Sequence, residues 1–203
     1  MGKRSDGFEK SPRGFYPTPW EAFEPLAPQL PRGTGIIDPC AGDGQLCHHL
    51  VNAGMTVSRF GAFDIAPRHS LVQQRDARKL TPADLGNATL FVTNPPWPLA
   101  GLNGEPTKGI LLHLSSLRPT WALLPSDFMF NVYAGALMLR CHAVLPIGRV
   151  KWIPGSKDVG KENCAWFLFG AGAPSGGMRF IPRTARQTRQ ARPRQKDREA
   201  EAA

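Results

Sequence analysis

Short apolar runs alternate with helix-like segments along most of this chain, and the polar residues that end three of these runs constrain the fold most. The three runs lie at 35–37, 55–63 and 88–93, and they are followed by Asp38, Asp64 and Asn94. Strands that alternate with helices predict a mostly parallel sheet with helices on both faces. We therefore expect an α/β, Rossmann-like fold of about seven strands, with a ligand bound past the strand ends.

Further segments complete the predicted order of elements. Residue spacing predicts helices at 45–53, 109–117 and 128–139, and strands at 121–124, 144–152 and 165–169. Gly54 follows the first of these helices, at a position where glycine commonly ends a helix. The last two strands are expected to form a hairpin around 153–163. The aromatic side chains expected in the core are those of Phe128, Phe130, Trp166, Phe167 and Phe169.

The positive charge of the chain is concentrated near its C-terminus. The net charge is +9, and the stretch from Arg183 to Arg198 has seven basic residues and one acid, which gives 7 − 1 = +6. We expect a flexible arm at 1–14, a folded domain at 15–182 and a basic, disordered tail at 183–203. In a helix induced by a partner, Arg183, Arg186 and Arg189 would share one face. Such a tail either binds nucleic-acid phosphates or only improves solubility.

Composition argues against several classes of protein. No apolar stretch approaches the roughly 20 residues of a membrane span, and residues 1–11 lack the apolar core of a signal peptide. We therefore expect a cytoplasmic protein without a membrane partner. Cys47, His48 and His49 are consecutive, but no second ligand pair lies at zinc-finger spacing. Buried thiols and no bound metal are the simpler interpretation.

A glycine-bearing loop follows the first predicted strand and leads into a helix. It reads Asp38-Pro39-Cys40-Ala41-Gly42-Asp43-Gly44. Glycines allow a sharp turn and a close approach of a ligand to the backbone, and the first helical amides can bind a polar group. Asp64 lies 64 − 44 = 20 residues beyond Gly44, where an acid can bind ribose hydroxyls. A plain turn before a helix is the alternative, and the third glycine of a dinucleotide loop is replaced by Cys47.

A second motif, Asn94-Pro95-Pro96-Trp97, ends the strand predicted at 88–93. Two prolines donate no backbone hydrogen bonds and hold the chain extended. The stretch therefore presents a rigid amide, free carbonyls and a flat aromatic ring at the mouth of the sheet.

Together these motifs resemble those of the class I S-adenosylmethionine-dependent methyltransferases that modify adenine N6 in DNA, in particular the small enzymes of phages and prophages. The resemblance lies in Asp38-Pro39-x-x-Gly42-x-Gly44 followed by Asn94-Pro95-Pro96-Trp97. Upstream, Phe15-Tyr16-Pro17-Thr18-Pro19 resembles the segment that helps to close over the cofactor in this family. The late stretch Asn163-Cys164-Ala165-Trp166-Phe167-Leu168-Phe169 is similar to a strand motif of the same group. The resemblance covers about residues 15–169.

The resemblance implies a role for each motif in binding S-adenosylmethionine. Asp38, Cys40 and the backbone from Gly42 to Gly44 would contact its methionine end. Asp64 would bind its ribose and Asp76 its adenine amino group. The residues that would contact the methionine part or cover the site are Phe15, Tyr16 and Thr18.

The second motif would hold the amine that receives the methyl group. An aromatic exocyclic amine is a poor nucleophile because its lone pair is delocalised into the ring. Hydrogen bonds to the Asn94 side-chain oxygen and the Pro95 carbonyl would localise that lone pair and stabilise the developing positive charge. Pro96 would keep both acceptors rigid, and Trp97 would stack on an extruded base.

Residues outside these motifs would contact nucleic acid. The candidates are Lys151, Lys157, Lys161, Arg183, Arg186 and Arg189. Because the chain has little room for a separate recognition domain, reading of the target would depend on the loops 98–108 and 154–162 or on the N-terminal arm. We expect a short or relaxed target site, and a monomer or weak homodimer.

Other functions fit the same motifs. A protein glutamine N5 methyltransferase uses a similar clamp on an amide, but its glycine loop usually reads Asp-x-Gly-x-Gly. An adenine in RNA or a cytosine amino group is a further candidate substrate. A nucleic-acid-binding module without turnover is the alternative outside the enzymes, and the intact Asp38, Gly42, Gly44 and Asn94 argue against it.

Overall fold

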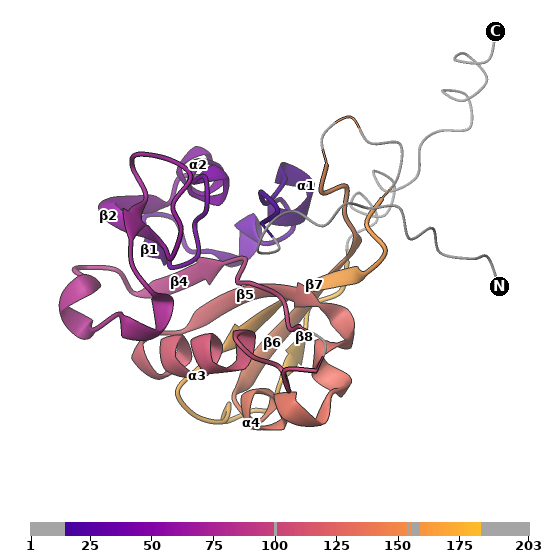
Figure 1. Ribbon diagram of the computed structural model, residues 1–203. Coiled ribbons are helices and arrows are strands. Elements are labelled where there is room, and N and C mark those ends of the chain that lie inside the picture. Colours follow the sequence, from indigo (N-terminus) through magenta and orange to yellow (C-terminus); the bar gives the residue numbers. More distant parts are fainter. Residues whose placement is uncertain (1–14, 100, 154, 156–158, 184–203) are drawn as a thin grey trace, which may run out of the picture.

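The computed structural model describes residues 15–99, 101–153, 155 and 159–183. The predicted arm at 1–14, and all of the predicted tail except Arg183, lie outside the described residues. Eight strands form one sheet in the order β3-β2-β1-β4-β5-β7-β6-β8 (Figure 1). Their bounds are Gly35–Asp38 (β1), Thr56–Asp64 (β2), Gln73–Gln74 (β3), Leu90–Thr93 (β4), Thr120–Pro125 (β5), Cys141–Arg149 (β6), Asn163–Phe169 (β7) and Arg179–Phe180 (β8).

The sheet is mostly parallel, as the sequence predicts. β1 pairs in parallel with β2 and β4, and β4 pairs in parallel with β5. β7 runs antiparallel between β5 and β6, so β6 and β7 form the predicted hairpin. The carboxyl ends of β1, β2 and β4 therefore lie at one edge of the sheet, and these ends carry Asp38, Asp64 and Asn94.

Helices pack on both faces of the sheet, which confirms the layered architecture (Figure 1). The α-helices are Trp20–Phe23 (α1), Gln45–Asn52 (α2), Thr107–Leu117 (α3) and Gly135–Met138 (α4). Short 3₁₀ helices are Ala27–Gln29 (η2), Ala77–Lys79 (η3), Pro82–Asp84 (η4), Ser126–Phe130 (η5) and Val132–Ala134 (η6).

Alternation along the strands divides the core between the two faces, because successive side chains of a strand point in opposite directions. Ile36 of β1 and Val92 of β4 pack in the cluster that contains α1 and α2. Their neighbours Ile37 and Phe91 pack in the cluster that contains α3.

The helix predicted at 128–139 is wrong. This stretch instead consists of η5, η6 and α4. Asn131, whose backbone is extended (φ −85°, ψ 139°), separates η5 from η6. The Asn131 side chain donates to the carbonyls of Asp127 and Phe128, which a continuous helix would use for its own amides. The break turns Phe130 outward, so this residue is 81% exposed and is not part of the core. The other four aromatic residues predicted there are buried.

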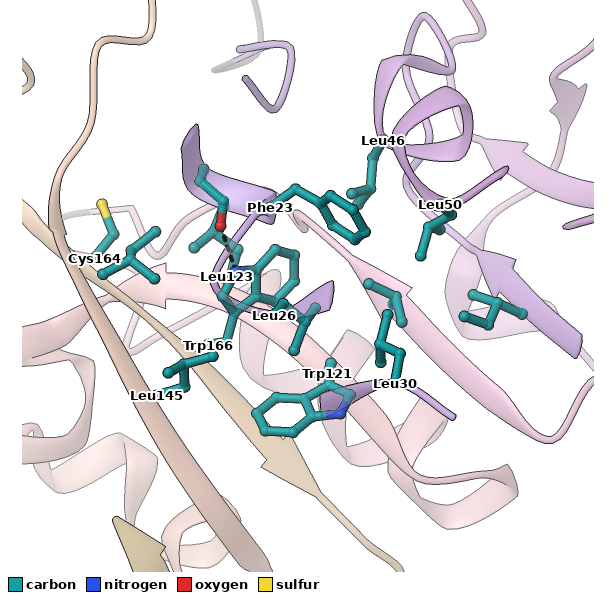
Figure 2. Close-up of a cluster of buried hydrophobic side chains, with 14 of the residues drawn as sticks. Phe23, Leu26, Leu30, Leu46, Leu50, Trp121, Leu123, Leu145, Cys164 and Trp166 are labelled. Carbon is teal, nitrogen blue, oxygen red and sulfur yellow. Dashed lines mark hydrogen bonds between the residues drawn. The ribbon is translucent and has the colours of Figure 1, made fainter. Parts of the chain in front are cut away.

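Trp166 of β7 fixes α1 against the sheet (Figure 2). Its indole is fully buried and its Nε1–H donates to the Ala22 carbonyl at 2.8 Å.

We expect Trp166→Phe to lower the free energy of unfolding by about 1–3 kcal/mol, because the Ala22 carbonyl would lose its donor inside the protein. Urea denaturation would measure this change. Trp20→Phe, which alters an indole that is 45% exposed, should change it by less than about 0.5 kcal/mol. Equal changes in the two variants would contradict a role for the hydrogen bond.

None of the helices among the described residues has both the length and the apolar character needed to cross a lipid bilayer.

Candidate active site

A cavity of about 560 Å³ lies at the carboxyl ends of β1, β2 and β4. Its walls come from the segment before α1, the loop after β1, the residues from the end of β2 to η3, the stretch after β4 with the start of α3, and the connection between β6 and β7. The predicted residues that line it are Phe15, Tyr16, Thr18, Asp38, Cys40, Asp64, Asp76, Asn94, Pro95, Pro96, Trp97 and Lys161. Gly42 and Gly44 shape the loop without being among the described residues that line the cavity.

Asp38 ends β1 inside the protein, with a side chain that is only 1% exposed. Its Oδ1 accepts hydrogen bonds from the Thr93 hydroxyl at 2.7 Å and the Cys40 amide at 3.1 Å. Burial raises the pKa of Asp38 to about 7, and the nearby carboxylates of Asp64 and Asp43 also raise it. The two hydrogen bonds oppose this rise only in part. Asp38 is therefore poised to gain a negative charge near neutral pH.

Two backbone amides, one of them in the glycine loop after β1, hold the side chain of Asp64. Its Oδ2 accepts from the Gly42 amide and its Oδ1 from the Ala66 amide, each at 2.8 Å. A carboxylate has about four acceptor sites, so both oxygens keep capacity for a ligand. Gly42 has φ +55°, and a Cβ there would lie 2.4 Å from the Phe15 ring. The loop therefore needs glycine both for its left-handed turn and for the packing of Phe15.

Asp76 lines the cavity but is already paired with Arg78, a residue that the sequence analysis missed. The Asp76 carboxylate accepts from Arg78 Nε at 3.1 Å and Nη2 at 2.7 Å, in addition to the Arg78 amide. The side-chain hydrogen bonds from Arg78 lower the pKa of Asp76. A ligand group that donates a hydrogen bond to Asp76 must therefore share this carboxylate with the Arg78 guanidinium. The sequence signal that could have predicted this ion pair is an arginine two residues after an acid.

Asn94 lies between two groups of opposite hydrogen-bonding character. Its Nδ2 donates to the Tyr16 carbonyl at 3.3 Å, and its Oδ1 accepts from the Trp97 indole Nε1–H at 3.2 Å. The Thr107 hydroxyl donates to the Pro96 carbonyl at 2.6 Å. Among the described residues, no donor reaches the Pro95 carbonyl. The stretch thus keeps one side-chain and one backbone acceptor able to take a hydrogen bond.

Aromatic rings from three distant segments meet beside Asn94. Trp97 and Trp152 contact edge to face with centroids 5.4 Å apart, and Tyr16 lies 6.3 Å from Trp152. All three residues line the cavity. The Trp97 side chain is half-buried. It packs against the core cluster that contains α1 and α2 and against a second cluster that contains Phe128 and Phe167. The sequence analysis placed Trp152 at the end of the strand predicted at 144–152 and did not predict that its ring lies beside Asn94.

Solved structures of other proteins share this arrangement of strands and helices. The type IIG restriction endonuclease BpuSI is 14% identical, with a TM-score of 0.51 over 77% of this chain and 25% of that one. A modification subunit of a putative type I restriction enzyme from Vibrio vulnificus YJ016 is 13% identical, with a TM-score of 0.51 over 87% of this chain and 52% of that one. The chain therefore spans about a quarter to a half of the structures it resembles. It has the Rossmann-like methyltransferase fold. No family model and no curated protein sequence matches it.

The predicted nucleic-acid residues are spread over this fold. Lys161 lines the cavity, while Lys151 is exposed and its backbone amide donates to Glu21. The guanidinium of Arg183 lies against Gly148 of β6, and this side chain is half-buried. Those that fall outside the described residues are Lys157, Arg186 and Arg189. Among the described members of this set, Lys161 alone lines the cavity.

One arginine at the cavity carries a contact that the sequence analysis missed. The Arg68 guanidinium lies 4.2 Å above the centre of the Phe15 ring, and the Arg68 amide donates to the Gly42 carbonyl. Arg68 thereby ties the segment before α1 to the glycine loop.

The cysteines are free thiols, and burial raises the pKa of Cys40 well above its usual range. Among the described residues, no group of three His, Cys, Asp or Glu side chains is arranged to hold a metal ion. His49 of the Cys47-His48-His49 run instead contacts the Thr18 carbonyl through Nε2 at 3.0 Å.

Proposed function

We propose that this protein transfers a methyl group from S-adenosylmethionine to the exocyclic N6 amino group of adenine in DNA. One observation carries the proposal: the acids at the ends of β1 and β2 and the amide after β4 line a single cavity. A cofactor bound by Asp38 and Asp64 would thus lie next to an amine bound by Asn94.

The residues of the cavity suit this cofactor. About 560 Å³ falls within the range of roughly 300–1,000 Å³ that is usual for small-molecule sites. The buried carboxylate of Asp38 can bind the ammonium group at the methionine end, and the carboxylate of Asp64 can accept from the two ribose hydroxyls. Asp76, together with Arg78, would meet the adenine ring. When bound, the cofactor supplies a methyl group on a positively charged sulfur.

The raised pKa of Asp38 leads to a prediction about pH. Below its pKa of about 7 the carboxyl is protonated and neutral, so binding of a cationic ammonium must first expel a proton. We expect cofactor affinity to rise about tenfold per pH unit below pH 7 and to level off above it. Calorimetric titration from about pH 5.5 to 8.5 would measure this dependence. Asp38→Asn should flatten the profile, and an affinity that falls as pH rises would contradict the assignment.

The chemistry of the amine depends on two fixed acceptors. The Asn94 Oδ1 and the Pro95 carbonyl would accept both amino hydrogens and make the nitrogen lone pair available for attack. Pro95 is buried and the Pro96 carbonyl is tied to Thr107, so the acceptors need not reorganise during the reaction. The proton released after transfer can pass to water.

The aromatic wall favours a nucleobase over a glutamine side chain. Tyr16, Trp97 and Trp152 offer flat surfaces to a planar ring, and stacking on such a surface contributes roughly 1–3 kcal/mol per base. A glutamine amide would gain little from these rings. The loop sequence Asp-Pro-x-x-Gly also differs from the Asp-x-Gly-x-Gly of the glutamine enzymes.

Incubation with radiolabelled S-adenosylmethionine and DNA, RNA or protein in parallel tests the proposal. Label in DNA that is recovered as N6-methyladenine is the expected result, and sequencing of the modified bases would define the target site. Label in RNA or protein alone would replace DNA with the other substrate. Calorimetry with S-adenosylmethionine tests the alternative of a nucleic-acid-binding module, because a degenerate module that has lost its cofactor site should release no heat of binding.

A further inference from the structure

We infer that Trp97 is a positioning residue that orients the Asn94 amide, through a hydrogen bond from its indole Nε1–H. This inference rests on the proposed function of the Asn94 oxygen as an acceptor for the target amine. It assigns Trp97 a task that its flat ring alone could not perform.

An asparagine amide must be oriented because its two ends have nearly the same shape. Rotation by half a turn about the last side-chain bond exchanges the oxygen and the nitrogen. Only the oxygen can accept a hydrogen bond from a substrate amine, whereas the nitrogen would meet it with two further donors. An Asn94 with the wrong end toward the amine would therefore repel the substrate hydrogens and could not localise the lone pair.

The groups around Asn94 permit one orientation. The Trp97 indole nitrogen can only donate, and it lies 3.2 Å from Oδ1. The Tyr16 backbone carbonyl can only accept, and it lies 3.3 Å from Nδ2. A rotated amide would place donor against donor at one end and acceptor against acceptor at the other. The chemistry of these two neighbours thus selects the same orientation as the geometry.

Trp97 is itself held in place, so it can act as a fixed reference. Its Nε1–H is shared with the carbonyl of Leu123 in β5, at 3.1 Å. Leu123 is fully buried, and the Trp97 ring packs against both large core clusters. The Asn94 oxygen keeps a second lone pair for the substrate, because the indole occupies only one of its two acceptor positions.

Trp97→Phe separates this task from stacking, because phenylalanine keeps a flat ring and lacks only the N–H. We expect kcat for methyl transfer to fall about tenfold or more, because the Asn94 oxygen would lose the donor that fixes its position and a small misplacement of a catalytic group is costly. The KM for the nucleic acid and the affinity for S-adenosylmethionine should change by less than about threefold. Trp20→Phe removes an exposed indole elsewhere and should leave both constants unchanged. A change in KM alone would overturn the inference in favour of stacking.

A second measurement does not depend on activity or on the folding of Trp97→Phe. In protein labelled with ¹⁵N, the Trp97 indole signal is assigned and followed in Asn94→Ala. We expect this signal to shift and its proton to exchange faster with solvent, while the Trp20 indole signal stays in place. An unchanged Trp97 signal would overturn the hydrogen bond. Failure of the proposed function would appear separately: the wild-type protein would methylate no substrate, while Asn94→Ala would still shift the Trp97 indole signal.

Discussion

Asn94→Ala is expected to lower the rate of methyl transfer by about 10²–10³-fold, the cost of removing one fixed hydrogen-bonding group at the reacting centre. Alanine removes the side-chain acceptor that would localise the amine lone pair and stabilise the positive charge formed during transfer. The acids that would bind the cofactor, Asp38 and Asp64, keep their own hydrogen bonds to the loop. Affinity for S-adenosylmethionine should therefore change by no more than about threefold.

Single-turnover rates and calorimetric titration would measure the two quantities for Asn94→Ala. Asn87→Ala is the matched control, because it removes the same group at an exposed position away from the cavity. Near-normal turnover in Asn94→Ala would refute the clamp. A loss of cofactor binding equal to the loss of rate would instead assign Asn94 to the cofactor site.

Gly42→Ala is expected to weaken S-adenosylmethionine binding by about tenfold or more, or about 1.4 kcal/mol. The new Cβ would lie 2.4 Å from the Phe15 ring, so the segment before α1 would have to move away from the loop. The positive φ of +55° adds backbone strain of about 1–2 kcal/mol for a residue with a side chain. Both effects act on the loop that donates the Gly42 amide to Asp64.

Gly86→Ala separates strain from crowding. Gly86 has a similar φ of +50°, but nothing lies within 4 Å of the position of a new Cβ. Backbone strain should lower the unfolding free energy of both variants by about 1–2 kcal/mol, and the clash with Phe15 should add to the loss in Gly42→Ala, as measured by urea denaturation. Only Gly42→Ala should lose cofactor affinity. Equal affinity in the two variants would show that the contact of Phe15 with the loop does not support the site.

The local sequence was enough to predict which strand ends and polar residues form the cavity. Each of the first three predicted strands contains apolar residues that are buried in the structure, and each is followed directly by its polar residue. Because parallel strands bring their carboxyl ends to one edge, chain position alone was enough to bring Asp38, Asp64 and Asn94 together. Glycine at the turn into α2 followed from the same local reasoning, since only a residue without a Cβ suits its left-handed backbone.

The tertiary structure decided which partners these residues have. Tyr16, Trp97 and Trp152 form one wall although up to 136 positions separate them, and no local pattern encodes that meeting. The break at Asn131 depends on side-chain hydrogen bonds that compete with helix formation. The orientation of the Asn94 amide likewise depends on a donor-only indole and an acceptor-only carbonyl. The strand ends can be predicted because they follow from the pattern of apolar residues along the chain. The hydrogen-bond partners cannot, because they depend on side-chain directions that only tertiary packing fixes.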